Sequence, residues 1–126
     1  MKMIFVGVWT ESYSTSHSQA RGFEAHGTHV LRYDFKERLN ALKNRELRDN
    51  ELIALIHKEK PDFVLFAKCA CMDVRVIHEC NKTSKSVFWF MDASHNFVEK
   101  AQRKVEHCHL AVAGCEGVWK LSLIHI

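Results

Sequence analysis

Polar side chains that could do chemistry follow an apolar run in the second half of the sequence. Residues 87–91 are all large and apolar, and Asp92, Ser94 and His95 come after them. A short run without polar alternation is typical of a central strand in a parallel sheet, buried by helices on both faces. Ligands of open α/β sheets bind outside the carboxyl ends of the strands. We therefore expect Asp92, Ser94 and His95 to line a binding site.

Other polar residues come after further apolar runs, at positions that would share the same edge of the sheet. The other predicted strands are residues 2–8, 29–33, 63–67 and 109–113, and the rim residues follow all of these but 29–33. The rim that results is rich in hydroxyl groups and suits a polyhydroxylated ligand. Its expected members are Thr10, Glu11, Ser14, His17, Lys68, Cys69, Asp92, Ser94, His95, Glu116 and Gly117.

His17 and Asp92 are the rim residues that could act as a base. His17 falls in the first turn of a predicted helix, where the positive end of the helix dipole favours the neutral imidazole. A neutral imidazole can accept a proton from a hydroxyl group. Two plainer interpretations stay open: His17 as a surface residue of its helix, and Asp92 as the cap of a helix or loop.

The elements that would position this rim alternate between strand and helix. Capping-box patterns predict helix starts at Ser16, Asp34 and Asn96. Asp49 is expected to start a further helix and Pro61 to end it. The alternation runs to a fifth strand with short connections, which predicts a Rossmann-like, three-layer α/β domain with a parallel sheet of about five strands.

Composition sets the class of protein. The chain has 126 residues, of which 26% are charged and 47% hydrophobic, and this is typical of one globular domain. A net charge of +3, spread over predicted helices, argues against a nucleic-acid partner. No signal peptide or membrane-spanning run is found, and the five cysteines suit reduced thiols. The expected location is the cytoplasm.

Several cofactor classes lack their motifs. The sequence has neither the glycine-rich dinucleotide fingerprint nor a Walker-type phosphate loop. Cys69 and Cys71 are separated by one residue, which is not zinc-hairpin spacing, so no bound metal is expected. Asp92 could be the phosphoacceptor of a receiver domain, but the exit of the first strand supplies only Glu11 for the acidic pair that this chemistry needs.

The last six residues break the pattern before them. Residues 118–120 read as the start of a helix, whereas residues 121–126 do not continue it amphipathically. The peptide Leu-Ser-Leu-Ile-His-Ile resembles the conceptual translation of a sequencing adapter. We therefore expect residues 1–120 to form the domain and 121–126 to be a non-native tail; a short terminal strand is the alternative.

Seven short segments, taken in order and spacing, resemble the amino-terminal half of bacterial spore-maturation-protein-like glycosyltransferases (CgeB type) of GT-B architecture. The resemblance covers nearly all of residues 1–120. The segments are Gly7-Val8-Trp9, Gln19-Ala20-Arg21-Gly22-Phe23-Glu24, Arg32-Tyr33-Asp34, Glu59-Lys60-Pro61-Asp62, Val76-Ile77-His78-Glu79-Cys80-Asn81-Lys82, Trp89-Phe90-Met91-Asp92 and Glu116-Gly117-Val118-Trp119.

The resemblance implies that this chain is the acceptor-side domain of an enzyme that transfers a sugar from a nucleotide sugar to an acceptor. In that family a second, carboxyl-terminal domain holds the donor, and transfer usually needs no bound metal. The implied partners are therefore a sugar acceptor, a nucleotide sugar and the missing donor domain. The chain alone is expected to bind no cofactor and to be inactive in transfer.

With this resemblance, His17 and Asp92 become the candidate catalytic bases. The expected acceptor-binding residues are Trp9, Thr10, Glu11, Ser14, Lys68, Cys69, Ser94, His95, Glu116 and Gly117. Ala93 stands where relatives tend to have a proline, so the loop after Asp92 departs from the family pattern. A different class stays open, namely a stand-alone, flavodoxin-like module that binds a small molecule or a protein.

Overall fold

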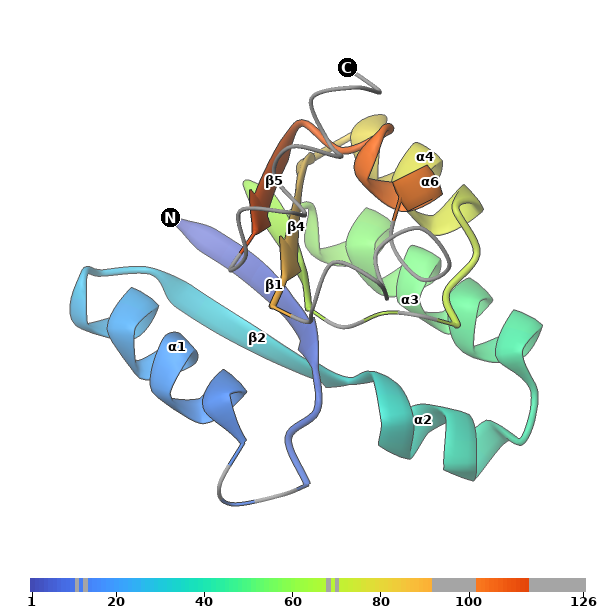
Figure 1. Cartoon of the computed structure of the whole chain (residues 1–126), viewed down its shortest axis with the longest axis horizontal. Helices are drawn as coiled ribbons and strands as arrows, with labels where there is room; N and C mark the ends of the chain where they lie inside the picture. Colours follow the sequence, from blue (N-terminus) through green and yellow to red (C-terminus); the bar gives the residue numbers. More distant parts are fainter. Residues whose placement is uncertain (11, 13, 68, 70, 92–101, 114–126) are drawn as a thin grey trace.

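The computed structural model describes residues 1–10, 12, 14–67, 69, 71–91 and 102–113 (Figure 1). In these residues one sheet of five parallel strands has the order β2-β1-β3-β4-β5. The strands are β1 (Lys2–Gly7), β2 (His29–Asp34), β3 (Phe63–Ala67), β4 (Lys85–Phe90) and β5 (Leu110–Ala113). The helices are α1 (Thr15–Ala25), α2 (Phe35–Leu42), α3 (Arg45–Glu59), α4 (Arg75–Asn81) and α6 (Gln102–Val105). The predicted α/β class and parallel sheet are confirmed.

The two faces of the sheet bury alternate residues of the central strands. Ile4 and Val6 of β1 pack in the core that α3, α4 and α6 cover, whereas Met3 and Phe5 pack on the side of α1. Figure 1 shows α1 on one side of the sheet and α3 and α4 on the other. Because both faces are covered, β1 reads in the sequence as a continuous apolar run rather than as an alternating one.

β4 is less enclosed than its apolar sequence predicts. Phe88 and Phe90 are buried, but Val87 and Trp89, on the side of α1, are only partly buried. Met91 lies just beyond the strand and is 50% exposed. The reason is that α1 is the one helix of the described residues that covers this side, and it packs mainly against β2, at the far edge of the sheet from β4.

Two helix starts differ from the prediction. α1 begins after Ser14 rather than Ser16, and Ser16 is buried inside the helix. A Cβ atom at Gly7 would lie 2.9 Å from the Ser16 hydroxyl oxygen, so a larger residue there would force the Ser16 side chain to move. α3 begins after Asn44, whose Oδ1 accepts a hydrogen bond from the Leu47 backbone at 3.0 Å.

The other helix predictions have mixed outcomes. Asp34 caps α2 as expected, and its Oδ1 accepts a hydrogen bond from the Glu37 backbone at 2.8 Å. α3 ends at Glu59, two positions before Pro61, as the proline predicts. The predicted start at Asn96 lies outside the described residues. None of the helices in the described residues is long and apolar enough to cross a membrane.

Candidate functional site

The described part of the predicted rim comes from β1, β3 and α1. Trp9 and Thr10 follow β1, Ser14 and His17 lie at the start of α1, and Cys69 follows β3. The remaining predicted residues lie outside the described ranges: Glu11, Lys68, Asp92, Ser94, His95, Glu116 and Gly117. The carboxyl ends of β1 and β3 are neighbours in the sheet, and the chain leaves them in opposite directions, which is where ligands of doubly wound sheets bind.

Asp34 fixes the backbone on one side of this position. Its Oδ2 accepts hydrogen bonds from the backbone N–H groups of Trp9 and Thr10, both at 2.9 Å. Its Oδ1 is occupied by the N-cap bond to α2. One buried carboxylate therefore ties the exit of β1 to the end of β2 and the start of α2. The sequence indicated only the capping role, because the other two donors lie far from Asp34 along the chain.

His17 and Ser14 are also held by the loop that follows β1. His17 Nε2 lies 2.9 Å from the Trp9 carbonyl oxygen. A carbonyl only accepts, so Nε2 must carry the proton, and Nδ1 is the nitrogen that could act as a base. Ser14 Oγ donates to the Val8 carbonyl at 2.8 Å and accepts from the Ser16 backbone. Ser14 is thus engaged in shaping the loop.

Cys69 does not reach the rim. Its side chain is fully buried, and burial raises the pKa of the thiol to about 12. Its sulfur lies 3.5 Å from the Ala67 carbonyl and 3.9 Å from the Val6 carbonyl, to which it can donate. In this position Cys69 is a core residue and not a ligand contact.

A pocket of about 460 Å³ lies beside Trp9, at the carboxyl ends of β1 and β2; we call it the Trp9 pocket. The indole is oriented by a hydrogen bond from Nε1 to the Tyr33 carbonyl at 3.1 Å. The Arg32 guanidinium lies 5.3 Å from the centroid of the indole ring, and the His17 ring meets the indole edge-on at 5.4 Å. The lining residues are Trp9, Arg32, Tyr33, Asp34, Glu37, Arg38, Glu51 and Leu55.

The polar side of the Trp9 pocket is a fixed ion pair. Glu51 accepts two hydrogen bonds from Arg38, to Oε1 at 2.8 Å and to Oε2 at 2.7 Å, and one from the Tyr33 hydroxyl at 3.0 Å. The hydrogen bonds from Arg38 hold the pKa of Glu51 below its usual value. Burial, together with the bond to Glu51, raises the pKa of Tyr33. Glu51 therefore stays ionised and Tyr33 stays a neutral donor at neutral pH.

A second pocket, of about 520 Å³, lies on another side of α3; we call it the Asp49 pocket. It is formed by the first turns of α3, the loop after β3 and the start of α4. Its lining is strongly charged and carries both signs. The lining residues are Arg45, Glu46, Asp49, Cys71, Met72, Asp73 and Arg75.

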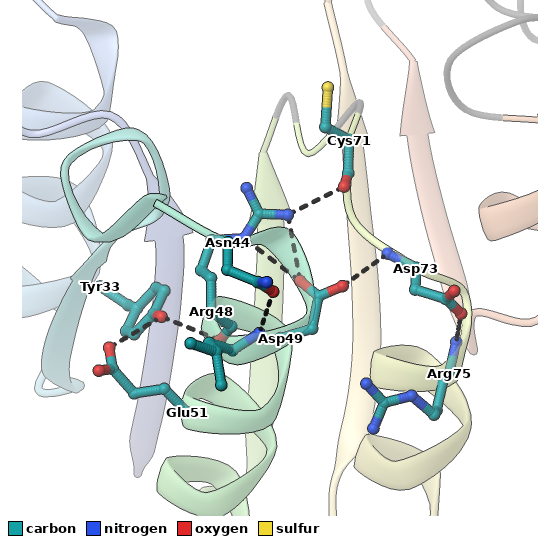
Figure 2. A network of polar contacts seen from close by, with 9 residues as sticks. Tyr33, Asn44, Arg48, Asp49, Glu51, Cys71, Asp73 and Arg75 are labelled. Carbon is teal, nitrogen blue, oxygen red and sulfur yellow. Dashed lines mark hydrogen bonds and ion pairs between the residues drawn. The ribbon is translucent and has the colours of Figure 1, made fainter. Parts of the chain in front are cut away.

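A fully buried ion pair lies behind this pocket (Figure 2). Arg48 donates to Asp49 Oδ1 from Nε at 3.2 Å and from Nη2 at 3.1 Å, and Nη2 also donates to the Cys71 carbonyl at 2.9 Å. Asp49 Oδ2 accepts from the Asp73 backbone at 3.1 Å. The Arg48 guanidinium also stacks 4.1 Å from the ring centroid of Phe35. The pair therefore holds the loop after β3 against α3.

The sequence did not predict this ion pair. The sequence pattern indicated a turn or kink at residues 44–48, with Asp49 as the cap of a new helix, whereas the break between α2 and α3 lies at Lys43 and Asn44. In the structure Arg48 and Asp49 are both buried, four and three positions before Leu52, on the buried stripe of a continuous α3. The only indication of this burial in the sequence is the spacing of Arg48 and Asp49 from Leu52, which places both side chains in line with the apolar stripe of the helix.

Among the described residues, no group of three or more His, Cys, Asp or Glu side chains is arranged to hold a metal ion. Comparisons of the chain with protein-family models, curated proteins and solved structures gave no match.

Proposed function

We propose that the chain is the acceptor-side domain of a GT-B glycosyltransferase, and that the acceptor occupies the Trp9 pocket. The observation that carries the proposal is the pairing of an oriented indole with a fixed carboxylate and guanidinium in one pocket. A sugar or polyol offers an apolar C–H face and a ring of hydroxyls. The indole can pack against the C–H face, and Glu51 and Arg38 can form hydrogen bonds with the hydroxyls.

The size and location of the pocket support the same conclusion. Its volume of about 460 Å³ falls within the range of small-molecule sites. Tyr33 and Glu51, two of its lining residues, have shifted pKa values, as functional sites often do. It lies at the carboxyl ends of β1 and β2, next to the point between β1 and β3 where the direction of the chain along the sheet reverses.

The proposed chemistry needs one base on this side of the active site. As the acceptor hydroxyl oxygen attacks the anomeric carbon of the nucleotide sugar, Nδ1 of His17 takes the hydroxyl proton. The new C–O bond forms while the bond from the anomeric carbon to the diphosphate breaks, and the nucleotide leaves with that electron pair. His17 contacts Trp9 and so adjoins the pocket. Asp92 is the other candidate base.

A second candidate function is a stand-alone, flavodoxin-like binding module. The specific observation in its favour is the strand order β2-β1-β3-β4-β5, which is the order of flavodoxin-like domains. The downstream coding sequence separates the two candidates. A second α/β domain in the same reading frame supports the transferase, and a stop codon after a final helix supports the module.

Binding by the chain itself is tested with isotopically labelled protein. We expect neutral oligosaccharides and polyols to shift the Trp9 indole N–H signal saturably, and we expect Trp9→Leu to abolish binding while the rest of the spectrum keeps its dispersion. Trp89→Leu is the matched control, since Trp89 lies in β4 away from the pocket. If no carbohydrate shifts the Trp9 signal, the acceptor proposal is wrong.

A further inference from the structure

Arg48 has hydrogen-bonding capacity that the protein leaves unused. A guanidinium carries five N–H donors. In Arg48, Nε and Nη2 donate hydrogen bonds to the Asp49 carboxylate, and Nη2 also donates to the Cys71 carbonyl. Nη1 is buried and has no hydrogen-bond partner, in a side chain with 0% exposure. Buried donors without acceptors are rare because each one has lost its hydrogen bonds to water and gained none in return. Such a donor is therefore a candidate for ligand recognition.

The unused nitrogen faces the end of the sheet where ligands bind. In Figure 2, Nη1 points away from Asp49, toward the same end of the molecule as Cys71 and the first turn of α3. Arg45 and Arg75 line the adjacent Asp49 pocket. Within the described residues neither of these two guanidinium groups has a hydrogen-bond or ion-pair partner. The positive end of the dipole of α3, a helix of 15 residues, lies at the same place.

We propose that this end of α3 binds an oxyanion, a phosphate or carboxylate group of a ligand. Nη1 of Arg48 is the buried donor, and Arg45 and Arg75 are the outer cations. The site is separate from the Trp9 pocket and does not depend on the glycosyltransferase proposal. Its chemistry is charge-assisted hydrogen bonding from arginine, which suits phosphate and carboxylate oxygens better than neutral ones.

The carboxylates that line the Asp49 pocket predict which substitutions should strengthen anion binding and which should weaken it. Asp49 is neutralised by Arg48, and Asp73 Oδ1 accepts from the Arg75 backbone at 2.8 Å. Glu46 lines the pocket and has no partner among the described residues. Its negative charge opposes an anion. Removing that charge must therefore strengthen binding, whereas removing Arg45 or Arg75 must weaken it.

Access to Nη1 requires movement, because the atom is covered in this conformation. The segment that could move is the loop at residues 71–73. Two of its backbone groups are tied to α3, the Cys71 carbonyl by Arg48 and the Asp73 N–H by Asp49. When the Cys71 carbonyl moves away, one oxyanion oxygen can accept from Nη2 in its place and a second oxygen can accept from Nη1, so that both nitrogens are satisfied.

The test is a titration of the whole chain, with isotopically labelled arginine side chains, against inorganic phosphate and, separately, acetate. We expect a saturable shift of the Arg48 Nε–H signal, and the anion that saturates at the lower concentration identifies the class of ligand. The signal is assigned from its contact with the Phe35 ring, so no variant of the buried Arg48 is needed. A non-saturable shift, or one shared by all arginines, would overturn the proposal.

Variants give the second readout. Arg45→Ala and Arg75→Ala are each expected to weaken binding about threefold, the effect of one partly exposed charge, and Glu46→Gln to strengthen it about as much. Arg21→Ala on α1, which removes an exposed arginine away from the pocket, is the matched control. An equal loss in the control, or weaker binding in Glu46→Gln, also contradicts the proposal. The sugar titration of the Trp9 pocket is independent of every one of these results.

Discussion

Asp34 accepts a hydrogen bond from the backbone N–H of Trp9 at 2.9 Å, and this contact joins the ends of two adjacent parallel strands. The same carboxylate accepts from Thr10 and caps α2 through Glu37. The loop that carries Trp9 is therefore positioned by a side chain from β2 as well as by Ser14 and His17. One buried carboxylate thus helps to set the shape of the Trp9 pocket.

Asp34→Ala should lower the free energy of unfolding by about 2–3 kcal/mol, because three backbone donors lose their acceptor at a buried position. Asp34→Asn should lower the free energy of unfolding by a smaller amount, because the amide oxygen can still accept a hydrogen bond from either the Glu37 backbone or the backbone of Trp9 and Thr10. Urea unfolding measures both changes. Asp62→Ala is the control: Asp62 also accepts a backbone N–H, from Lys2, but at an exposed position. An equal loss in both alanine variants would contradict the assigned role.

The strands could be predicted from the sequence because a strand that is buried on both faces of the sheet appears as a continuous apolar run. β3 was expected at residues 63–67 and is found at Phe63–Ala67. β1 and β5 each differ by one residue at one end. A continuous apolar run bounded by polar residues has few other structural solutions in a chain of this size.

The start of α3 could not be predicted in the same way. Its buried stripe contains Arg48 and Asp49, and a pattern based on hydrophobicity counts both as exposed. Only their mutual ion pair and the Cys71 and Asp73 backbone groups make burial tolerable, and those groups are distant in sequence. The Asp49 pocket was missed for this reason. Trp9, by contrast, was expected at the site because it directly follows the predicted first strand, residues 2–8.

Asp49→Ala should destabilise the fold by roughly 3–5 kcal/mol, because Arg48 would keep a buried charge without a counterion. The side chains of Arg48 and Asp49 are 0% and 3% exposed, so solvent screening does little for the pair. The double variant Arg48→Met with Asp49→Leu should cost roughly half as much or less, since no charge is left behind. Urea unfolding of both variants gives the comparison. If the double variant proves the less stable one, the pair contributes net stability of its own.

The Arg38–Glu51 ion pair should make stability depend on pH in the acid range. The hydrogen bonds from Arg38 hold the pKa of Glu51 below the ordinary value of 4.5. A depressed pKa contributes stability that is complete above 4.5 and is lost as the pH falls through the value in the folded protein. Glu51→Gln should therefore flatten the fall in melting temperature below about pH 4.5. Glu59 and Glu79 have pKa values shifted in the same direction, so part of the slope should persist.

The partner variant for this pH dependence is Arg38→Gln, which removes the cation that holds the pKa of Glu51 below its usual value. Its melting temperature should also fall less steeply than that of the wild-type protein in the acid range. Identical profiles for Glu51→Gln and wild type would show that the ion pair seen beside the Trp9 pocket does not persist in solution.

The cysteines should differ in reactivity according to their burial. Burial raises the pKa of Cys69 and of Cys80 to about 12, so both stay protonated thiols at neutral pH. Cys71 is exposed and lines the Asp49 pocket. A maleimide applied to the native protein should therefore label Cys71 well before Cys69 or Cys80, as measured by peptide mass mapping over time. Denaturant should abolish the difference. Saturating phosphate should also slow labelling of Cys71 if the oxyanion site is occupied, whereas early labelling of Cys69 would show that the loop after β3 is not held as described.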